Sequence, residues 1–263
     1  MQTGTHILDK IIEYKRGEVF LRKGLMPANV LERYPFFGSP CHSLAGRLQS
    51  GSGNGVIAEF KRRSPSKGVL NDTAKVEKVA ADYARFGASA ISVLTDEKFF
   101  GGSSDDLMAA REAVDIPLLR KDFVIDEYQL LEAKAIGADL ILLIAACLTP
   151  AEVRSLAGFS KGLGLEVLLE LHGEDELGHV CDEVDMVGIN NRNLKTFEVD
   201  LERSLRMAER IPAGKPRIAE SGIHSVEQVH MFRQHGFSGF LMGEQFMKAA
   251  DPGEAFRSFV SAI

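Results

Sequence analysis

The 263-residue sequence lacks tryptophan and contains only three cysteines, Cys41, Cys147 and Cys181. These scattered residues show no metal-ligand spacing, which is typical of free, mostly buried thiols in a reducing compartment. The sequence has no apolar run near the roughly 18 residues that a membrane-spanning helix needs. It also shows no apolar signal segment, because residues 7–19 have the pattern of a charged helix. We therefore expect a soluble, cytoplasmic protein without a membrane partner.

An excess of basic residues is also missing. The net charge of −6 and the pI near 5.7 argue against a general nucleic-acid binder. None of the seven histidines has the spacing of a metal site. No GxGxxG follows the first predicted strand and no P-loop is present. We expect no metal ion and no cofactor, while the local basic run at residues 61–63 suggests a small anionic ligand.

The sequence does contain a unit that repeats from residue 56 onward. In each unit a short apolar run ends in polar residues, an amphipathic helix follows, and a glycine turn leads to the next run. The runs are continuously apolar rather than alternating, as in strands that are buried on both faces. The eight runs are Val56–Phe60, Ala90–Leu94, Pro117–Arg120, Leu140–Ile144, Leu165–Glu170, Met186–Asn190, Pro216–Glu220 and Gly239–Met242.

Helix-boundary signals lie between these runs. Thr149 with Glu152, and Ser225 with Gln228, have the spacing of capping boxes at helix N-termini. Glycines close several helices just before the next strand, where a C′ residue adopts a left-handed conformation. These glycines are Gly87, Gly137 and Gly236.

Eight such units predict an α/β protein with a closed (β/α)8 TIM barrel that forms a single domain over residues 1–263. The alternative is an open doubly wound sheet, which usually has fewer strands and a different nucleotide fingerprint. Residues 1–55 are predicted to add one strong helix over residues 6–23 and a weaker one over 40–49. We interpret this N-terminal helical extension as a lid or plug on the barrel rather than a separate domain.

Ionisable side chains gather where the predicted strands end, and the active site of such a barrel lies at the carboxyl ends of its strands. Glu59 and Lys61 are alternate residues and point to the same face, although together they could be a structural ion pair. Lys121 with Asp122 could be a solvated loop pair. The convergence on one rim nevertheless predicts an active site. Its members are Glu59, Lys61, Asp96, Lys98, Lys121, Asp122, Glu170, Asn190, Arg192, Glu220, Ser221 and Glu244.

Glycines follow the last two predicted strands, with Gly222 after the seventh and Gly243 after the eighth. Small residues there let backbone N–H groups approach a phosphate, which is the usual phosphate site of this barrel. Ser64 faces the same region from the first strand, the neighbour of the eighth in a closed barrel. A simple turn function is the alternative, and the occurrence after both strands favours phosphate.

Six segments carry a resemblance to a known family: AEFKRRSPSKG at 58–68, SVLTDEKFFGGS at 92–103, LRKDFVIDEYQ at 119–129, LLELH at 168–172, GINNRNL at 188–194 and AESGI at 219–223. In order and spacing they resemble indole-3-glycerol phosphate synthase of tryptophan biosynthesis, over nearly the whole chain. The resemblance implies ring closure, decarboxylation and dehydration of 1-(2-carboxyphenylamino)-1-deoxyribulose 5-phosphate to indole-3-glycerol phosphate. The length is that of a monofunctional version.

The resemblance also implies roles for the charged residues. Lys121 would be the acid that protonates the oxyanion when the aryl carbon attacks the ketone, and we expect burial beside other cations to lower its pKa toward neutrality. Lys61 would contact the substrate carboxylate or take part in proton transfer. Glu170 would act in acid–base steps with the departing hydroxyl, and Glu59 would hold and tune both lysines.

The remaining residues that the resemblance places in the site fall into three groups. Further catalytic residues are Asn190 and Ser221, and Arg192 and Glu220 would lie around the hydroxyls and the ring of the substrate. The phosphate would bind at Ser64, Gly222, Gly243 and Glu244. Because a carboxylate would repel phosphate, we expect only the backbone N–H of Glu244 to contribute, with its side chain turned away. The aromatic ring would lie among Leu94, Phe100, Phe123 and Leu142, whose alternative role is plain core packing.

Two other functions stay open. An isomerase acting on phosphoribosyl anthranilate usually needs one acid and one base, so the two lysines with Glu170 argue against it. A non-catalytic sensor or scaffold barrel that binds a phosphorylated ligand would not need the intact set of Glu59, Lys61, Lys121, Glu170 and Asn190. We expect a phosphorylated small-molecule substrate and a monomer or weak homodimer.

Overall fold

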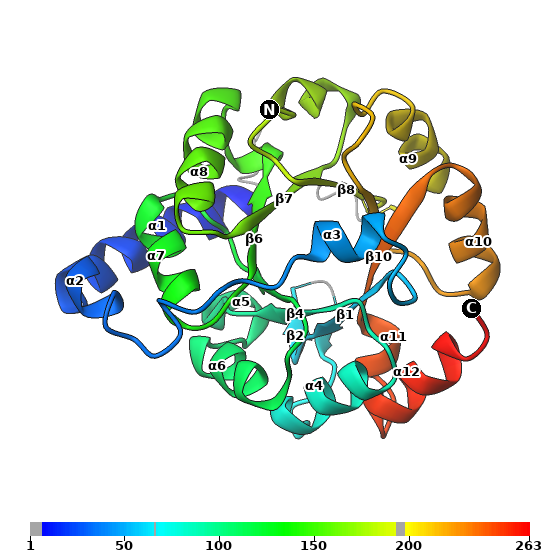
Figure 1. Cartoon of the computed structure of the whole chain (residues 1–263), viewed down its shortest axis with the longest axis horizontal. Coiled ribbons are helices and arrows are strands. Elements are labelled where there is room, and N and C mark those ends of the chain that lie inside the picture. Colours follow the sequence, from blue (N-terminus) through cyan, green and yellow to red (C-terminus); the bar gives the residue numbers. More distant parts are fainter. Residues whose placement is uncertain (1–6, 66, 193–197) are drawn as a thin grey trace, which may run out of the picture.

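The computed structural model describes residues 7–65, 67–192 and 198–263. Its barrel strands are β1 (Val56–Phe60), β4 (Ala90–Leu94), β5 (Leu118–Lys121), β6 (Leu140–Ile144), β7 (Glu166–Leu171), β8 (Met186–Asn190), β9 (Arg217–Glu220) and β10 (Phe237–Met242). Each is parallel to its neighbours, and β10 pairs with β1, which closes the barrel inside a ring of helices (Figure 1). The TIM-barrel prediction is confirmed, and the open sheet is excluded.

All eight predicted strands are present, and their ends agree within two residues. The strand predicted from Pro117 starts at Leu118 instead, in keeping with the missing N–H of proline. The last strand begins two residues earlier than predicted, at Phe237, and its register with β9 shifts between Phe237 and Gly239. The apolar runs therefore located the strands well, while the irregular pairing at the start of β10 left no signal in the pattern.

Helices cover the outside of the barrel and the loops at its carboxyl end. They are α4 (Val76–Arg85), α5 (Glu97–Phe100), α6 (Ser104–Ala113), α7 (Glu127–Ala135), α8 (Pro150–Gly162), α9 (Leu201–Ala208), α10 (Val226–Gln234), α11 (Glu244–Met247) and α12 (Pro252–Val260). Both predicted capping boxes are confirmed, as are the left-handed glycines at 87, 137 and 236. No described helix is long and apolar enough to cross a membrane.

Three connections differ from the repeating unit. The helix predicted after β7 is replaced by a 3-10 stretch, η2 (Glu174–His179), and β6 is followed by a short 3-10 turn, η1 (Ala145–Cys147). The loop after β1 forms a small hairpin of β2 (Arg63–Ser64) and β3 (Gly68–Val69). Residue 66, within the first resemblance segment, lies outside the described residues.

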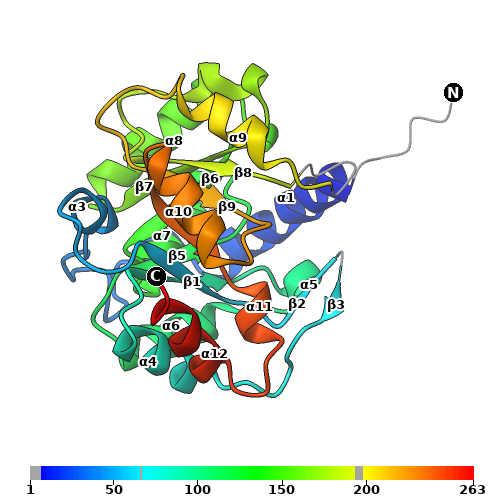
Figure 2. The same cartoon turned by 90° about the vertical axis from the view of Figure 1, so that its right-hand side faces the viewer.

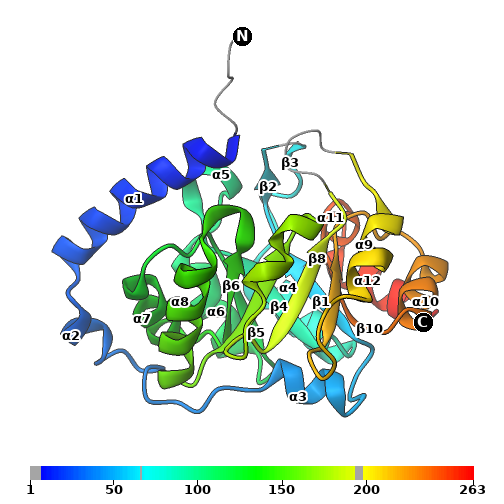
Figure 3. The ribbon, with the colours of Figure 1, turned by 90° about the horizontal axis from the view of Figure 1, so that it is seen from above.

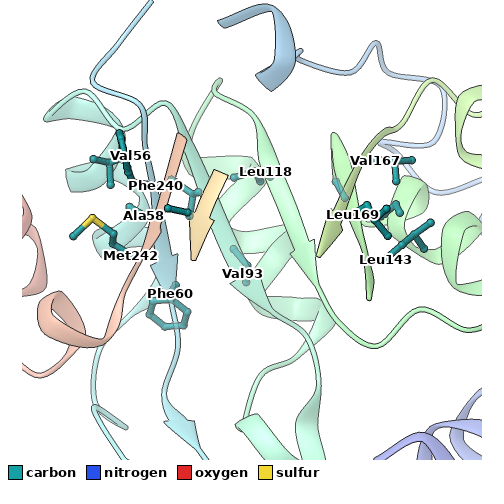
Figure 4. Packing of buried hydrophobic residues seen from close by; sticks show 14 of the residues in the cluster. Val56, Ala58, Phe60, Val93, Leu118, Leu143, Val167, Leu169, Phe240 and Met242 are labelled. Atoms are coloured by element: carbon teal, nitrogen blue, oxygen red, sulfur yellow. The ribbon is translucent and has the colours of Figure 1, made fainter. Parts of the chain in front are cut away.

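Alternation along each strand separates two cores. Residues that point outward pack against the helices, as Val56, Leu143 and Phe240 do in Figure 4. Residues that point inward fill the barrel and form a separate apolar cluster. Its strand members are Ile57, Ala90, Leu119, Leu140, Leu142, Ile144, Leu168, Met186, Ile218 and Leu241.

The N-terminal segment contains α1 (Ile7–Leu25), α2 (Ala28–Leu31) and α3 (Leu44–Gln49), and α1 and α3 lie at opposite ends of the barrel (Figures 2 and 3). Leu44 and Leu48 of α3 join the interior cluster, and Glu166 at the start of β7 accepts hydrogen bonds from the N–H groups of Leu44 and Ala45 at 2.8 and 3.0 Å. Thus α3 plugs the amino end. Of the strong helix predicted over residues 6–23, residue 6 lies outside the described residues.

Candidate active site

The polar side chains of the site are the next inward-pointing residues above the apolar interior. Glu59 lies two positions after Ile57 on β1, and Lys121 lies two positions after Leu119 on β5. The same alternation turns Glu170 of β7, Asn190 of β8 and Glu220 of β9 inward. They line one cavity at the carboxyl end of the barrel. Of the residues that the sequence placed at the rim, Asp96 and Lys98 do not line the cavity. The cavity does bring together every residue to which the family resemblance gives a role: Glu59, Lys61, Ser64, Leu94, Phe100, Lys121, Phe123, Leu142, Glu170, Asn190, Arg192, Glu220, Ser221, Gly222, Gly243 and Glu244.

Lys121 is the centre of the charged group. Its ammonium donates to Glu170 Oε2 at 2.8 Å and lies 3.7 Å from Glu220 Oε2. Asn190 Nδ2 donates to the other oxygen of Glu170 at 3.0 Å. Lys61 pairs with Glu59, the alternate residue on the same strand face. Two ammonium groups thus meet three carboxyl groups in one largely buried site.

This charge balance overturns the expected pKa of Lys121. Burial alone would lower the pKa of its ammonium, but the charges of Glu170, Glu220 and Glu59 outweigh burial and raise that pKa above its ordinary value. Carboxylates, not other cations, are its close neighbours. Lys121 is therefore a charged proton donor at neutral pH rather than an amine that titrates near neutrality.

The pKa values of the two nearby glutamates are shifted in opposite directions. Burial would raise the pKa of Glu170, but Lys121 and His172 overcome it and hold that pKa well below its usual range. Burial and the negative charge of Glu170 raise the pKa of Glu220 well above its usual range, with Lys121 opposing them. The site therefore places two carboxyl groups with oppositely shifted pKa values beside one ammonium. Such a division between neighbouring carboxyl groups is how acid and base roles are separated.

One end of the cavity is apolar. The rings of Phe100 and Phe123 lie tilted with centroids 6.0 Å apart. Leu94 and Leu142 complete this end, and the first turns of α1 add Leu8 and Ile11, which the sequence interpretation did not assign to the site. Leu142 also belongs to the interior apolar cluster, so its side chain both lines the cavity and packs in the core of the barrel.

The other end carries the glycine loops. Ser221 has φ of 64° and is the one non-glycine residue with positive φ in the described chain, and Gly222 follows it at 72°. Asn191 Nδ2 donates to the carbonyl of Ser221 at 2.7 Å and holds this turn. Strain of this kind is often retained at functional sites. A Cβ atom on Gly243 would lie 2.6 Å from Cβ of Glu59, so a bare backbone is needed where β10 passes β1.

Glu244 does not turn fully away from the cavity, contrary to expectation. Its carboxylate accepts from Lys248 at 2.6 Å and lies 3.6 Å from Arg192 Nη2. Partial burial would raise the pKa of Glu244, but Lys248 and Arg192 lower it. The Glu244 carboxylate therefore lies at the edge of the glycine-rich end of the cavity, where two cations neutralise its charge.

Several rim residues belong to a second charged cluster instead. Lys15 of α1 is buried and contacts Asp96 at 2.9 Å, Asp122 at 3.0 Å and Glu18 at 3.1 Å. The interpretation of Lys121 with Asp122 as a solvated pair is wrong, because Asp122 is buried and is also bonded by Arg120. Lys15 lies between Ile11 and Val19 on the buried stripe of α1, and that position was the sequence signal for this cluster.

Arg62 and Arg63 of the local basic run and Lys98 of the predicted rim also have structural partners. Arg62 pairs with Asp106, and Arg63 donates to the carbonyls of Glu97 and Lys98 at 2.8 Å each. The ammonium of Lys98 lies 5.9 Å from the centre of the Tyr14 ring. These contacts hold the loops around the cavity, so the three side chains do not enter it.

A residue that the sequence interpretation missed lies against the Glu170 carboxylate. His172 Nε2 is 2.9 Å from Glu170 Oε1, whereas the sequence considered the histidines only as possible metal ligands. Gly188 is a second one: it is paired with Glu170 across β7 and β8, and a Cβ there would lie 2.1 Å from Glu220 Oε1. Among the described residues, no group of three or more His, Cys, Asp or Glu side chains could hold a metal ion. Residues 193 and 194 of the GINNRNL segment lie outside the described part.

Comparison with known proteins agrees with this geometry. The family profile described as indole-3-glycerol phosphate synthase matches residues 8–259. The indole-3-glycerol phosphate synthase of Bacteroides thetaiotaomicron is 49% identical over 257 residues, covering 98% of both chains, and that of Azoarcus is 43% identical, covering 96% of this chain and 98% of the relative.

Solved structures show the same fold at low identity. A 3-hexulose-6-phosphate synthase matches with a TM-score of 0.60 at 17% identity, over 79% of this chain and 98% of that one. A tryptophan synthase structure from Pyrococcus furiosus matches with a TM-score of 0.60 at 15% identity, over 80% and 97%. These low-identity structural matches support the fold alone. The full-length sequence matches show the family: this chain belongs to the indole-3-glycerol phosphate synthase family.

Proposed function

We propose that this protein is an indole-3-glycerol phosphate synthase that converts 1-(2-carboxyphenylamino)-1-deoxyribulose 5-phosphate to indole-3-glycerol phosphate, CO2 and water, in tryptophan biosynthesis. The observation that carries the proposal is the place of Lys121. Its ammonium lies between the carboxyl groups of Glu170 and Glu220, in a cavity with an apolar end and a glycine-rich end. The aromatic ring of the substrate matches the apolar end, its ketone matches the Lys121 ammonium, and its phosphate matches the glycine-rich end.

The two ends of the cavity would set the direction of the substrate. The aromatic ring fits between Phe100 and Phe123, and the phosphate fits the strained turn at Ser221 and the bare backbone at Gly243. The ketone carbon then falls near the middle, where Lys121 stands. Lys61, paired with Glu59, supplies a second cation for the carboxylate that the ring carries.

In the first step, the ring carbon that bears the carboxylate attacks the ketone carbon and a new carbon–carbon bond forms. The ketone oxygen gains the negative charge and takes a proton from the Lys121 ammonium, while the ring nitrogen becomes a cationic imine. The carboxylate then leaves as CO2, and its bonding electrons neutralise that nitrogen. A donor with raised pKa, already charged and buried, suits the protonation of a developing oxyanion.

In the last step, the new hydroxyl leaves as water and a proton is lost from the neighbouring carbon, which completes the aromatic indole. The departing hydroxyl needs a proton, and the carbon needs a base. We assign this step to Glu170, with Glu220 as the neutral acid beside it and Asn190 holding Glu170 in place. Arg192 at the cavity wall would bind the hydroxyl and phosphate side of the substrate.

The test is to mix the purified protein with the carboxyphenylamino-deoxyribulose phosphate and follow indole fluorescence. Because the chain has no tryptophan, the background is low. We expect a rise in fluorescence with release of one CO2 per indole. Folded protein that gives no signal would refute the proposal. Phosphoribosyl anthranilate serves as the second substrate, and its isomerisation would favour the isomerase alternative.

Two finer statements accompany the proposal. We propose that the protein acts in the cytoplasm as a monomer or weak homodimer, because the cavity is lined within one chain and needs no residue from a second copy to join its two ends. Light scattering at micromolar concentration should give a mass near 28.8 kDa. A stable larger assembly would contradict the statement.

A further inference from the structure

The Glu170 carboxylate is held by three groups from three directions. Lys121 donates to Oε2 at 2.8 Å, and Asn190 donates to Oε1 at 3.0 Å. The third group is His172, whose Nε2 lies 2.9 Å from the same Oε1. Lys121 and Asn190 line the cavity, whereas His172 is not part of its lining.

His172 is itself fixed by Glu176 of η2. The backbone N–H of His172 donates to Glu176 Oε2 at 2.6 Å, and Nδ1 of the ring lies 3.8 Å from the same oxygen. The His172 side chain is 10% exposed. Its ring nitrogens make no well-aligned hydrogen bond among the described residues, so these two carboxylates are the acceptors within reach. Since an ionised carboxylate only accepts hydrogen bonds, Nε2 must carry a hydrogen where it faces Glu170.

We propose that His172 is a positioning residue for the reaction, held by Glu176 and aiming the Glu170 carboxylate at the cavity. The proposal rests on the proposed synthase activity, which gives Glu170 its acid–base role. Without His172, Oε1 would keep only Asn190 among these partners, and the carboxylate could rotate away from the line between Lys121 and the substrate. A proton-transfer group that is misplaced by a fraction of an ångström loses rate while substrate binding stays nearly intact.

This position also explains the break in the repeating unit. A regular helix follows most of the barrel strands, but β7 is followed by the 3-10 stretch η2. The tight turn brings Glu176 back to within hydrogen-bond distance of the residue that follows β7. The exception to the repeat is therefore the segment that holds His172 against the reacting carboxylate.

The experiment uses two amides of different reach. In His172→Gln the amide nitrogen can occupy nearly the place of Nε2 and donate to Glu170, whereas in His172→Asn the amide nitrogen reaches only the place of Nδ1. We expect His172→Asn to lower kcat about ten- to hundredfold with KM within about twofold, the scale of a lost hydrogen bond to a charged group. His172→Gln should recover most of that loss.

The pH profile separates positioning from a structural role. His172 is one of the groups that lower the pKa of Glu170, so its loss should move the acidic limb of the kcat profile to higher pH. The other charged groups facing this pair are Lys121, Glu220 and Glu176, with the Cys147 thiol near both carboxylates. They are unchanged in the variants, so the shift reports on His172.

His179 provides the matched control, since it lies in the same η2 turn and its ring nitrogens face the backbone carbonyls of Glu176 and Leu148 at 2.9 Å each. His179→Asn should lower thermal stability without moving the acidic limb. If it moves the limb as His172→Asn does, the effect belongs to the turn and the proposal is overturned.

The outcomes also separate this proposal from the synthase activity. If the wild-type protein is inactive, the proposed function fails. If it is active and His172→Asn keeps kcat within twofold with an unmoved acidic limb, the role of His172 fails. Should His172→Asn not fold, nitrogen NMR of the wild-type ring decides, because a bare Nε2 facing Glu170 would overturn the proposal and a protonated Nε2 would support it.

Discussion

Two buried lysines lie close to the carboxyl end of β5, and they are held differently. Lys15 of α1 contacts three carboxylates, Glu18, Asp96 and Asp122, at 2.9–3.1 Å, and its side chain is 1% exposed. Lys121 contacts Glu170 at 2.8 Å, has Glu220 at 3.7 Å, and is 15% exposed. An ammonium has three N–H donors. Lys15 has a carboxylate for each donor, while Lys121 has donors left for a ligand.

The difference distinguishes a lysine that stabilises the fold from the one that we propose to react. Each lysine has a raised pKa, because in both cases nearby carboxylates outweigh the cost of burial. The direction of the pKa shift therefore does not tell them apart. The two lysines differ in how many acceptors surround their three N–H donors. A cluster with an acceptor for each donor is saturated and stabilises a docked helix, whereas an unsaturated cluster leaves N–H groups that can bind a substrate. Lys121 and Asp122, adjacent in sequence, belong to the two different clusters.

The largest expected effect is on turnover, in Lys121→Ala. Removing the acid should lower kcat about 10²- to 10⁴-fold, the usual contribution of a positioned proton donor, while substrate still binds. Stopped-flow or steady-state indole fluorescence measures kcat, and fluorescence titration measures binding. Near-normal turnover would refute the assignment of Lys121 as the acid and with it the contrast between the two lysines.

The opposite pattern is expected for Lys15→Met. The change leaves Asp96 buried without its Lys15 partner and Asp122 with Arg120 as its remaining cation, which should cost about 3–5 kcal/mol of the free energy of unfolding. Urea unfolding measures the loss, with Lys10→Met as the matched control because Lys10 is exposed on the same helix. Folded Lys15→Met should keep a far larger share of kcat than Lys121→Ala. A stability loss below about 1 kcal/mol, the scale of a surface pair, would show that the cluster does not anchor α1.

The contrast between these two lysines also marks the limit of prediction from sequence. The strands and the inward side of Glu59, Lys121, Glu170 and Glu220 were predictable, because continuous apolar runs locate strands and the side chains alternate by two. The same alternation places Asp122 on the other side of β5 from Lys121. Its partner on α1 was not predictable, because long-range packing of a helix on the barrel leaves no local pattern.

The electrostatics of Lys121 were the least predictable part of the site. Its pKa depends on how close carboxylates from β1, β7 and β9 come to one ammonium, and residue types alone do not give those distances. The expectation of a lowered pKa was therefore wrong in sign. His172 was missed for a related reason: its contact with Glu170 arises from a 3-10 turn where the repeat predicted a helix.

A pH test sharpens the comparison for Lys15. The pKa of its ammonium in the folded protein is raised above the ordinary 10.5, because Asp122, Asp96 and Glu18 outweigh burial. Its contribution to stability should be complete below pH 10.5 and should be lost as pH rises through the higher folded-state pKa. Urea unfolding of the wild type and Lys15→Met across this range isolates the effect, since the other lysines are common to both. The difference in the free energy of unfolding between the wild type and Lys15→Met should become smaller as the pH rises. A difference that stays constant would contradict the interpretation of Lys15 as the centre of a saturated cluster.

The smallest effect concerns the cation Arg192 at the glycine-rich end of the cavity. Glu244 lies 3.6 Å from Arg192 and so competes with an incoming anion for that cation. Glu244→Gln should strengthen inhibition by inorganic phosphate by less than about fivefold, the scale of one partly exposed pair, and the gain should shrink as salt screens it. Glu254→Gln is the control, because Glu254 makes a similar pair with Arg257 on α12, away from the cavity. Weaker phosphate inhibition in Glu244→Gln would mean that the Glu244 carboxylate holds Arg192 in place for the ligand instead of competing with the ligand. The glycine-rich end would then resemble the saturated cluster of Lys15 more than the open site of Lys121.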